Sequence, residues 1–172
     1  MLRKLIMALG AFFLFILQSC VFTQINMGGI LPNLILLITC IYGFMHGEKA
    51  GMVTGFALGL ISDILFGSFI GLNALILTFI GYLNGKFYGI YYPEDIKLPL
   101  GLVLTSNFSY GIVYYIFSYL IRGRLNLSYY FLHIILPEVL YTIITAIVIY
   151  PIVLLIERAF DKKEKAKKQS HA

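Results

Sequence analysis

Charged side chains are scarce in this chain of 172 residues: Asp, Glu, Lys and Arg make up 12% of it, whereas hydrophobic residues make up 60%. The mean hydropathy of +0.89 lies well outside the usual range of soluble domains. The longest polar stretches are the loop near residues 86–99 and the segment 158–172, which leaves no room for a soluble catalytic module. The composition therefore predicts an all-α integral membrane protein.

Cysteine and histidine are also rare. Cys20 and Cys40 both lie in apolar stretches, which gives no support to a disulfide framework or a thiolate metal site, and we expect core or lipid-facing thiols. His46, His133 and His171 show no metal-ligand spacing, and no phosphate-binding or dinucleotide-binding fingerprint occurs. We therefore expect no metal, no cofactor and no catalytic residue.

Six apolar segments predict a bundle of about six transmembrane helices. They are 5–22, 31–45, 50–66, 69–83, 100–121 and 131–156. A crossing needs roughly 17 to 25 residues, so the second and fourth segments are short and the last is long. The turns between 31 and 85 are short, which predicts that these three segments pack as antiparallel neighbours; a re-entrant hairpin is the alternative. Residues 1–157 are then one transmembrane domain.

The basic residues predict the orientation of the bundle. The net charge of +5 arises largely from the segment 158–172, which holds Arg158 and five lysines. With six crossings, every Lys and Arg except Arg122 and Arg124 falls on one side, and such an excess marks the cytoplasmic side. We therefore expect both termini in the cytoplasm, with a basic tail that binds anionic lipid and no nucleic acid.

The first segment, 5–22, also resembles an export signal, because Arg3 and Lys4 precede an apolar run that ends near Cys20. Gln18 fits a lipoprotein cleavage box poorly, and an even number of crossings with a basic tail works best if this helix is kept. We therefore expect residues 5–22 to be a permanent span.

Glycine recurs at every fourth position from residue 43 to residue 71, with Asp63 as the one exception. The glycines are Gly43, Gly47, Gly51, Gly55, Gly59, Gly67 and Gly71. Since a helix repeats about every 3.6 residues, this spacing keeps them on one slowly drifting stripe where another helix backbone can approach closely. We predict that Gly51, Gly55 and Gly59 pack helices together in lipid, either within the chain or against a partner.

Asp63 is an acid within an apolar segment, where an unpaired carboxylate would cost at least about 2.5 kcal/mol. One interpretation is a buried acid hydrogen-bonded to Asn73 or Asn107 that holds helices together. The other is a helix-end acid that meets interfacial water or the turn containing Ser68. In either case one carboxylate does not make an enzyme.

Glu138 is a second acid at membrane depth, directly after Pro137. Because proline lacks a backbone donor, we expect a kink here, or a helix that begins near residue 136 with Glu138 facing its positive end. The alternative is a polar patch for a partner helix, with Asn107, Tyr110 and Tyr141 nearby. Two isolated acids resemble neither an intramembrane protease nor a proton pump.

Several of these features occur together in an order that resembles the MreD family of bacterial rod shape-determining proteins. They are Pro32-Asn33-Leu34-Ile35-Leu36, Gly47, Gly51, Gly55-Phe56, Gly59-Leu60, Asp63, Gly71-Leu72-Asn73-Ala74, Gly81-Tyr82, and a last span that opens with Pro137-Glu138 and carries Tyr141 followed by Thr142. The resemblance covers essentially the whole chain and is sharpest over residues 32–85.

The resemblance implies a non-enzymatic bundle in the bacterial cytoplasmic membrane that binds MreC, a single-span periplasmic protein. It also implies membership of the cell-elongation machinery, with MreB filaments, the transglycosylase RodA and its transpeptidase partner. The family looks similar in fold to the substrate-binding membrane components of energy-coupling-factor vitamin transporters, so small-molecule binding is the second hypothesis. The sequence leaves open whether the protein forms a homo-oligomer.

Overall fold

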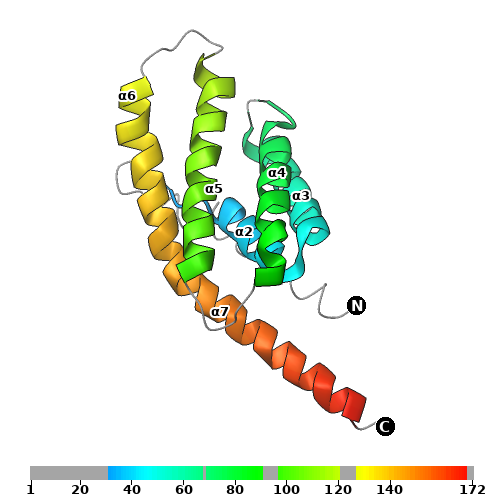
Figure 1. Cartoon of the computed structure of the whole chain (residues 1–172). Helices are drawn as coiled ribbons and strands as arrows, with labels where there is room; N and C mark the ends of the chain where they lie inside the picture. The colour runs from blue at the N-terminus through cyan, green and yellow to red at the C-terminus, as the bar shows by residue number, and fades with distance from the viewer. Residues whose placement is uncertain (1–30, 68, 91–96, 121–126, 170–172) are drawn as a thin grey trace.

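A computed structural model of the chain, shown in Figure 1, describes residues 31–67, 69–90, 97–120 and 127–169. The α-helices are α2 (Leu34–His46), α3 (Glu48–Phe66), α4 (Leu72–Gly85), α5 (Lys97–Tyr115), α6 (Leu127–Tyr130) and α7 (Leu136–Gln169). Between them lie the 3-10 helix η2 (Lys86–Ile90) and two π-helical turns, η3 (Ile116–Leu120) and η4 (Phe131–Ile135). The all-helical prediction is confirmed, while the predicted first span, 5–22, lies outside the described residues.

Three helical stretches in the described part of the chain are long and apolar enough to cross a membrane: Glu48–Phe66, Lys97–Ser118 and Ser128–Ile156. They correspond to the predicted third, fifth and sixth segments. Helix α2 is apolar but has only 13 residues, which makes it about 20 Å long against a hydrocarbon core of about 30 Å. The expectation that the second segment is short is therefore confirmed.

Helix α2 lies at the centre of the bundle. Nearly every residue from Leu34 to Met45 is buried, as expected for a helix that is apolar on all sides. It packs against α3, α4, α5 and α7, and Figure 1 shows it between α5 and the α3–α4 pair. The side chain of Asn33 begins this helix by accepting a 3.1 Å hydrogen bond from the backbone N–H of Leu36.

A single residue, Gly47, reverses the chain between α2 and α3. Its φ of +91° lies in the region that side-chain-bearing residues rarely adopt, and its N–H donates to the Gly43 carbonyl at 2.8 Å. This tight turn makes α2 and α3 direct neighbours, and α4 packs against both. The predicted packing of these three segments is confirmed.

The last segment does not begin at a free helix end near Pro137. Helix α7 begins at Leu136, but the chain is already helical from Leu127 through α6 and η4. The Leu136 N–H donates to the Phe131 carbonyl five residues earlier, so the π-helical turn lets the chain stay helical up to the proline, which has no donor of its own. The helical stretch that contains the predicted sixth segment, about 131–156, therefore begins at Leu127.

Helix α7 runs for 34 residues, about 51 Å, and continues through the predicted tail as far as Gln169. Figure 1 shows its second half projecting beyond the other helices.

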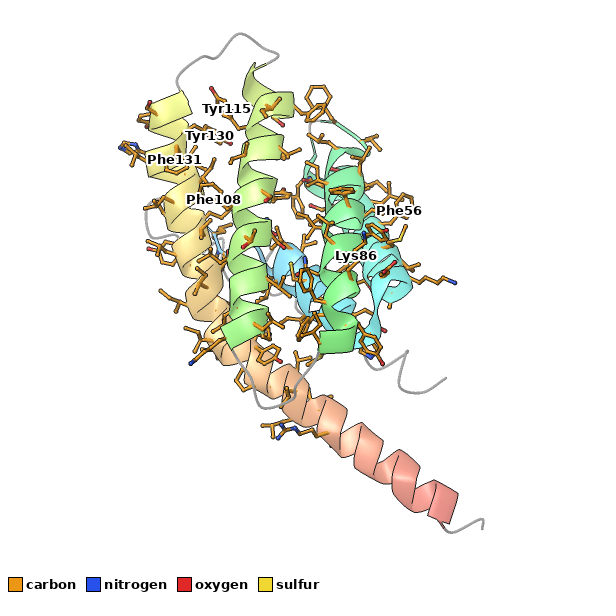
Figure 2. The ribbon with its side chains drawn as sticks, viewed as in Figure 1. Phe56, Lys86, Phe108, Tyr115, Tyr130 and Phe131 are labelled. Atoms are coloured by element: carbon orange, nitrogen blue, oxygen red, sulfur yellow. The ribbon has the colours of Figure 1, made fainter. Side chains whose placement is uncertain are left out.

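At the end of the bundle away from this projection, two aromatic contacts join the α5 helix to α6 and η4 (Figure 2). The ring centroids of Tyr115 and Tyr130 lie 4.9 Å apart, and Phe108 meets Phe131 edge to face at 5.5 Å.

Candidate functional site: a buried hydrogen-bond network

Asp63 is buried, with 1% of its surface exposed, and its carboxylate accepts three backbone hydrogen bonds from the start of α4. The donors are the N–H groups of Gly71, Asn73 and Ala74, at 2.9, 3.2 and 3.1 Å. The first N–H groups of a helix have no partner within it and carry a partial positive charge. Because Gly71 has no side chain to supply a cap, Asp63 of α3 supplies it.

These bonds combine features of the two sequence interpretations of Asp63. The acid is buried and bonded to Asn73, as the first interpretation expects, although through the Asn73 backbone rather than its side chain. The second interpretation also describes part of the geometry, because Asp63 lies in the last turn of α3 and accepts from Gly71 in the turn that follows, but the residue is only 1% exposed and is not a surface acid. Ser68 lies outside the described residues.

The middle of the glycine stripe, from Gly51 to Gly59, lies directly against α4. A Cβ atom on Gly51 would overlap the Gly81 carbonyl oxygen, one on Gly55 would overlap the Leu77 carbonyl oxygen, and one on Gly59 would lie 2.6 Å from the Ala74 Cα. Only glycine permits such close approach of two helix backbones. This face of α3 is therefore occupied within the chain, so a partner protein would bind on another surface.

Asn73 carries the network from α4 to α5. Its side chain is 8% exposed, and its Oδ1 accepts a 2.7 Å hydrogen bond from the Tyr110 hydroxyl. The same hydroxyl contacts the side chain of Asn33, which in turn donates to Glu138. Tyr110 therefore lies where the starts of α2, α4 and α7 come together.

Asn33, Glu138 and Thr142 join α2 to α7. The Asn33 Nδ2 donates to Glu138 Oε1 at 3.2 Å, and the Asn33 backbone N–H donates to the Thr142 Oγ1 at 2.9 Å. The Thr142 hydroxyl in turn donates to the Glu138 carbonyl at 2.7 Å. Each polar group here has a partner on the other helix or one turn away, as burial in an apolar bundle demands.

The structure brings Glu138 close to Tyr110, as one interpretation expects, but does not bring Asn107 or Tyr141 into the network. Asn107 is buried, and its Nδ2 has no hydrogen-bond partner among the described residues. Tyr141 is half-buried and contributes its carbonyl to Thr145 within α7. Pro137 precedes Glu138 in the chain and lacks a backbone donor. It follows the π-helical turn η4.

Two members of the network, Asn33 and Thr142, were not singled out as site residues from the sequence. Asn33 precedes an apolar run, which is the ordinary signal of a helix N-cap, but nothing local indicates its contact with a residue more than a hundred positions later. A second polar contact was also missed: the Asn84 Nδ2 donates to Ser106 Oγ at 2.8 Å and links α4 to α5.

Cys40 lies next to Ser106 and is a buried free thiol, as predicted for a core cysteine, while Cys20 lies outside the described residues. Among the residues that the structure describes, no group of three His, Cys, Asp or Glu side chains has a metal-binding arrangement.

The sequence of the whole chain decides the family. The family model for the rod shape-determining protein MreD matches residues 1–160. This chain belongs to the MreD family. No curated protein and no solved structure matches it. As an MreD family member, it is a rod shape-determining membrane protein and not an enzyme.

Proposed function

We propose that this MreD family member is a membrane scaffold that binds MreC and helps organise peptidoglycan synthesis within the cell-elongation machinery. The observation that carries the proposal is the Asp63 carboxylate, which is buried and fully engaged with the start of α4. An acid held in this way joins two helices, whereas a proton carrier or a catalytic acid must reach a reacting group.

The other polar residues of the network, which are buried or partly buried, support the same interpretation. Asn73 bonds Tyr110, and Asn33 bonds Glu138 and Thr142, so the polar groups of four helices are used to hold those helices against one another. Large apolar side chains cover the outward surface, among them Leu140 and Ile144 of α7. Such a surface suits a single-span partner, because helices in lipid associate mainly through close packing.

The complete topology is part of this proposal. Six crossings, with residues 5–22 as the first, place both termini in the cytoplasm of the bacterial cell and the basic residues of segment 158–172 against anionic lipid. Other membrane proteins of the elongation machinery are further proposed partners, and a second copy of this chain is another.

A substrate-binding component of a vitamin transporter is the second candidate. Asn107 favours it, because its buried Nδ2 lacks a partner among the described residues and a ligand would satisfy it. A binding component needs several polar groups turned toward one ligand, whereas the residues of the hydrogen-bond network are bonded to each other. The scaffold therefore explains more of the described polar residues.

A co-purification experiment distinguishes the scaffold from the transporter component. The tagged chain is purified from membranes that also contain MreC, and the eluate is analysed for proteins and for small molecules by mass spectrometry. The scaffold predicts retention of MreC in a fixed ratio with no stoichiometric metabolite. A metabolite present at one per chain, with MreC absent, would contradict it and favour the transporter.

A further inference from the structure

A shallow apolar groove of about 640 Å³ runs along the outer side of α3 and α4. Its lining residues are Met52, Phe56 and Leu60 of α3, with Gly71, Ala74, Leu75, Thr78, Phe79 and Tyr82 at the start of α4 or within it. The rims are open to the surroundings: Phe56 is 53% exposed, Leu75 69% and Phe79 60%. Figure 2 shows Phe56 on the side of the α3–α4 pair that lies away from α5 and α7.

One end of this groove carries two lysines. With about 3.6 residues per turn, Lys49 lies on the same face of α3 as Met52, Phe56 and Leu60, and Lys86 lies on the same face as Leu75, Phe79 and Tyr82. The Lys86 Nζ lies 4.7 Å from the centre of the Tyr82 ring, which lines the groove.

A backbone contact places the two lysines on adjoining turns at the start of α3 and the end of α4. A Cβ atom on Gly85 would overlap the Glu48 Cα, so the positions that immediately precede Lys86 and Lys49 touch. Both lysine side chains are exposed, and neither forms an ion pair with a residue that the structure describes. The acid at Glu48 lies about 100° around α3 from Lys49 and so projects from a different face.

The length of the groove matches half a bilayer. From Gly71 to Tyr82 it extends along α4 for about 16 Å, close to half of the hydrocarbon thickness of about 30 Å. A groove open to lipid is filled either by a hydrocarbon chain or by another helix. A hydrocarbon chain that ends in a negative phosphate accounts for both the apolar floor and the two lysines at one end, whereas an apolar helix offers those lysines no negative charge.

We propose that this groove binds one anionic phospholipid, with an acyl chain along α3 and α4 and its phosphate between Lys49 and Lys86. The positive-inside expectation assigns the lysine end to the cytoplasmic side, so the lipid belongs to the inner leaflet. This site is separate from the basic tail, and it depends on neither MreC binding nor the buried network.

Native mass spectrometry of the full chain tests the headgroup contact. The purified protein is offered phosphatidylglycerol and phosphatidylcholine with identical acyl chains. We expect one tightly held phosphatidylglycerol, preferred at least fivefold, and near-equal retention in Lys49→Gln/Lys86→Gln. The control Lys97→Gln/Arg158→Gln removes the same charge away from the groove and retains the preference. Equal retention of both lipids by the wild type, or equal losses in both double variants, would overturn the proposal.

Fluorescence tests the groove itself in the folded protein. The chain contains no tryptophan, so Leu75→Trp places a single reporter on the rim. In nanodiscs, phosphatidylglycerol with brominated chains should quench it more strongly than brominated phosphatidylcholine at the same fraction, and Lys49→Gln/Lys86→Gln in this background should remove the difference. Identical quenching by both lipids would overturn the proposal.

A further variant, Thr78→Phe, fills the groove floor while leaving both lysines in place. We expect it to release the bound phosphatidylglycerol without lowering the melting temperature by more than a few degrees. If Thr78→Phe instead releases MreC or a second copy of the chain and keeps the lipid, the groove is a helix-docking site and the proposal fails.

Discussion

The Asn33 side chain donates a 3.2 Å hydrogen bond to Glu138, which lies 105 residues later in the chain. Asn33 is also the N-cap of α2, so one residue both begins the central helix and fastens it to α7. A carboxylate at membrane depth is costly unless it has a partner. The pair therefore supports the register of two helices that are far apart in sequence.

Replacing Glu138 tests whether its hydrogen bond or its charge matters. Glu138→Gln keeps an oxygen that accepts from Asn33 and should lower the free energy of unfolding by less than about 1 kcal/mol. Glu138→Leu leaves the Asn33 amide without its partner and should cost about 1 to 3 kcal/mol. The measurement is unfolding by denaturing detergent, followed by circular dichroism. Equal losses in the two variants would show that the charge is the important property.

Thr142→Val tests the second bond between α2 and α7. It removes the oxygen that accepts the Asn33 N–H and leaves a buried backbone donor unpaired, at a cost of about 1 to 3 kcal/mol. The matched control is Thr145→Val, because the Thr145 hydroxyl donates to the carbonyl four residues earlier in α7, as the Thr142 hydroxyl does, but accepts no bond from α2. Its effect on the unfolding free energy should be clearly smaller. If both variants lower the free energy of unfolding by the same amount, the bond between Asn33 and Thr142 does not stabilise the contact of α2 with α7.

Gly55→Ala tests the contact between α3 and α4. The added methyl group would overlap the Leu77 carbonyl oxygen, so the two helices must separate, and we expect a lower melting temperature in size-exclusion thermal assays. Gly55→Leu should disrupt the bundle or its capture of MreC more strongly. Gly101→Ala of α5 is the control, since its methyl group would meet nothing within 4 Å and alanine favours helix by about 1 kcal/mol. A melting temperature for Gly55→Ala at or above that of Gly101→Ala would refute the contact.

Features with a short repeat could be predicted from the sequence. The third apolar segment, predicted as 50–66, is α3 at Glu48–Phe66, because hydropathy and glycine spacing are local patterns. The stripe also indicated where helices approach closely. The spacing alone did not indicate that α4 is the helix that packs on it, because this depends on the turn at Gly71 that follows α3.

Contacts that join distant segments could not be predicted in the same way. The partners of Asp63 are backbone N–H groups, which every non-proline residue carries and which therefore give no sequence signal. A search for a complementary side chain proposed the amides of Asn73 or Asn107, whereas Asp63 bonds the backbone of Asn73. Pro137 predicted a kink or a helix that begins near residue 136; α7 does begin at Leu136, but it follows a π-helical turn that keeps the chain helical before the proline. A proline marks the strained position but does not say how the backbone relieves the strain.

Asp63 gives the most direct test of the account, because its carboxylate is proposed to hold α4 in place and not to carry a proton. Asp63→Asn keeps an acceptor oxygen, whereas Asp63→Leu leaves three N–H groups at the start of α4 unpaired. Ile64→Leu, at a neighbouring position that is 64% exposed, is the control and should behave as wild type.

The measurement is rod shape and MreC co-purification in cells whose own copy of the protein is depleted and replaced by each variant. The account predicts rods and retained MreC with Asp63→Asn and with Ile64→Leu, and round cells with little MreC for Asp63→Leu. Round cells with Asp63→Asn, present in the membrane in normal amount and still bound to MreC, would contradict it, because the ionisable group itself would then be required.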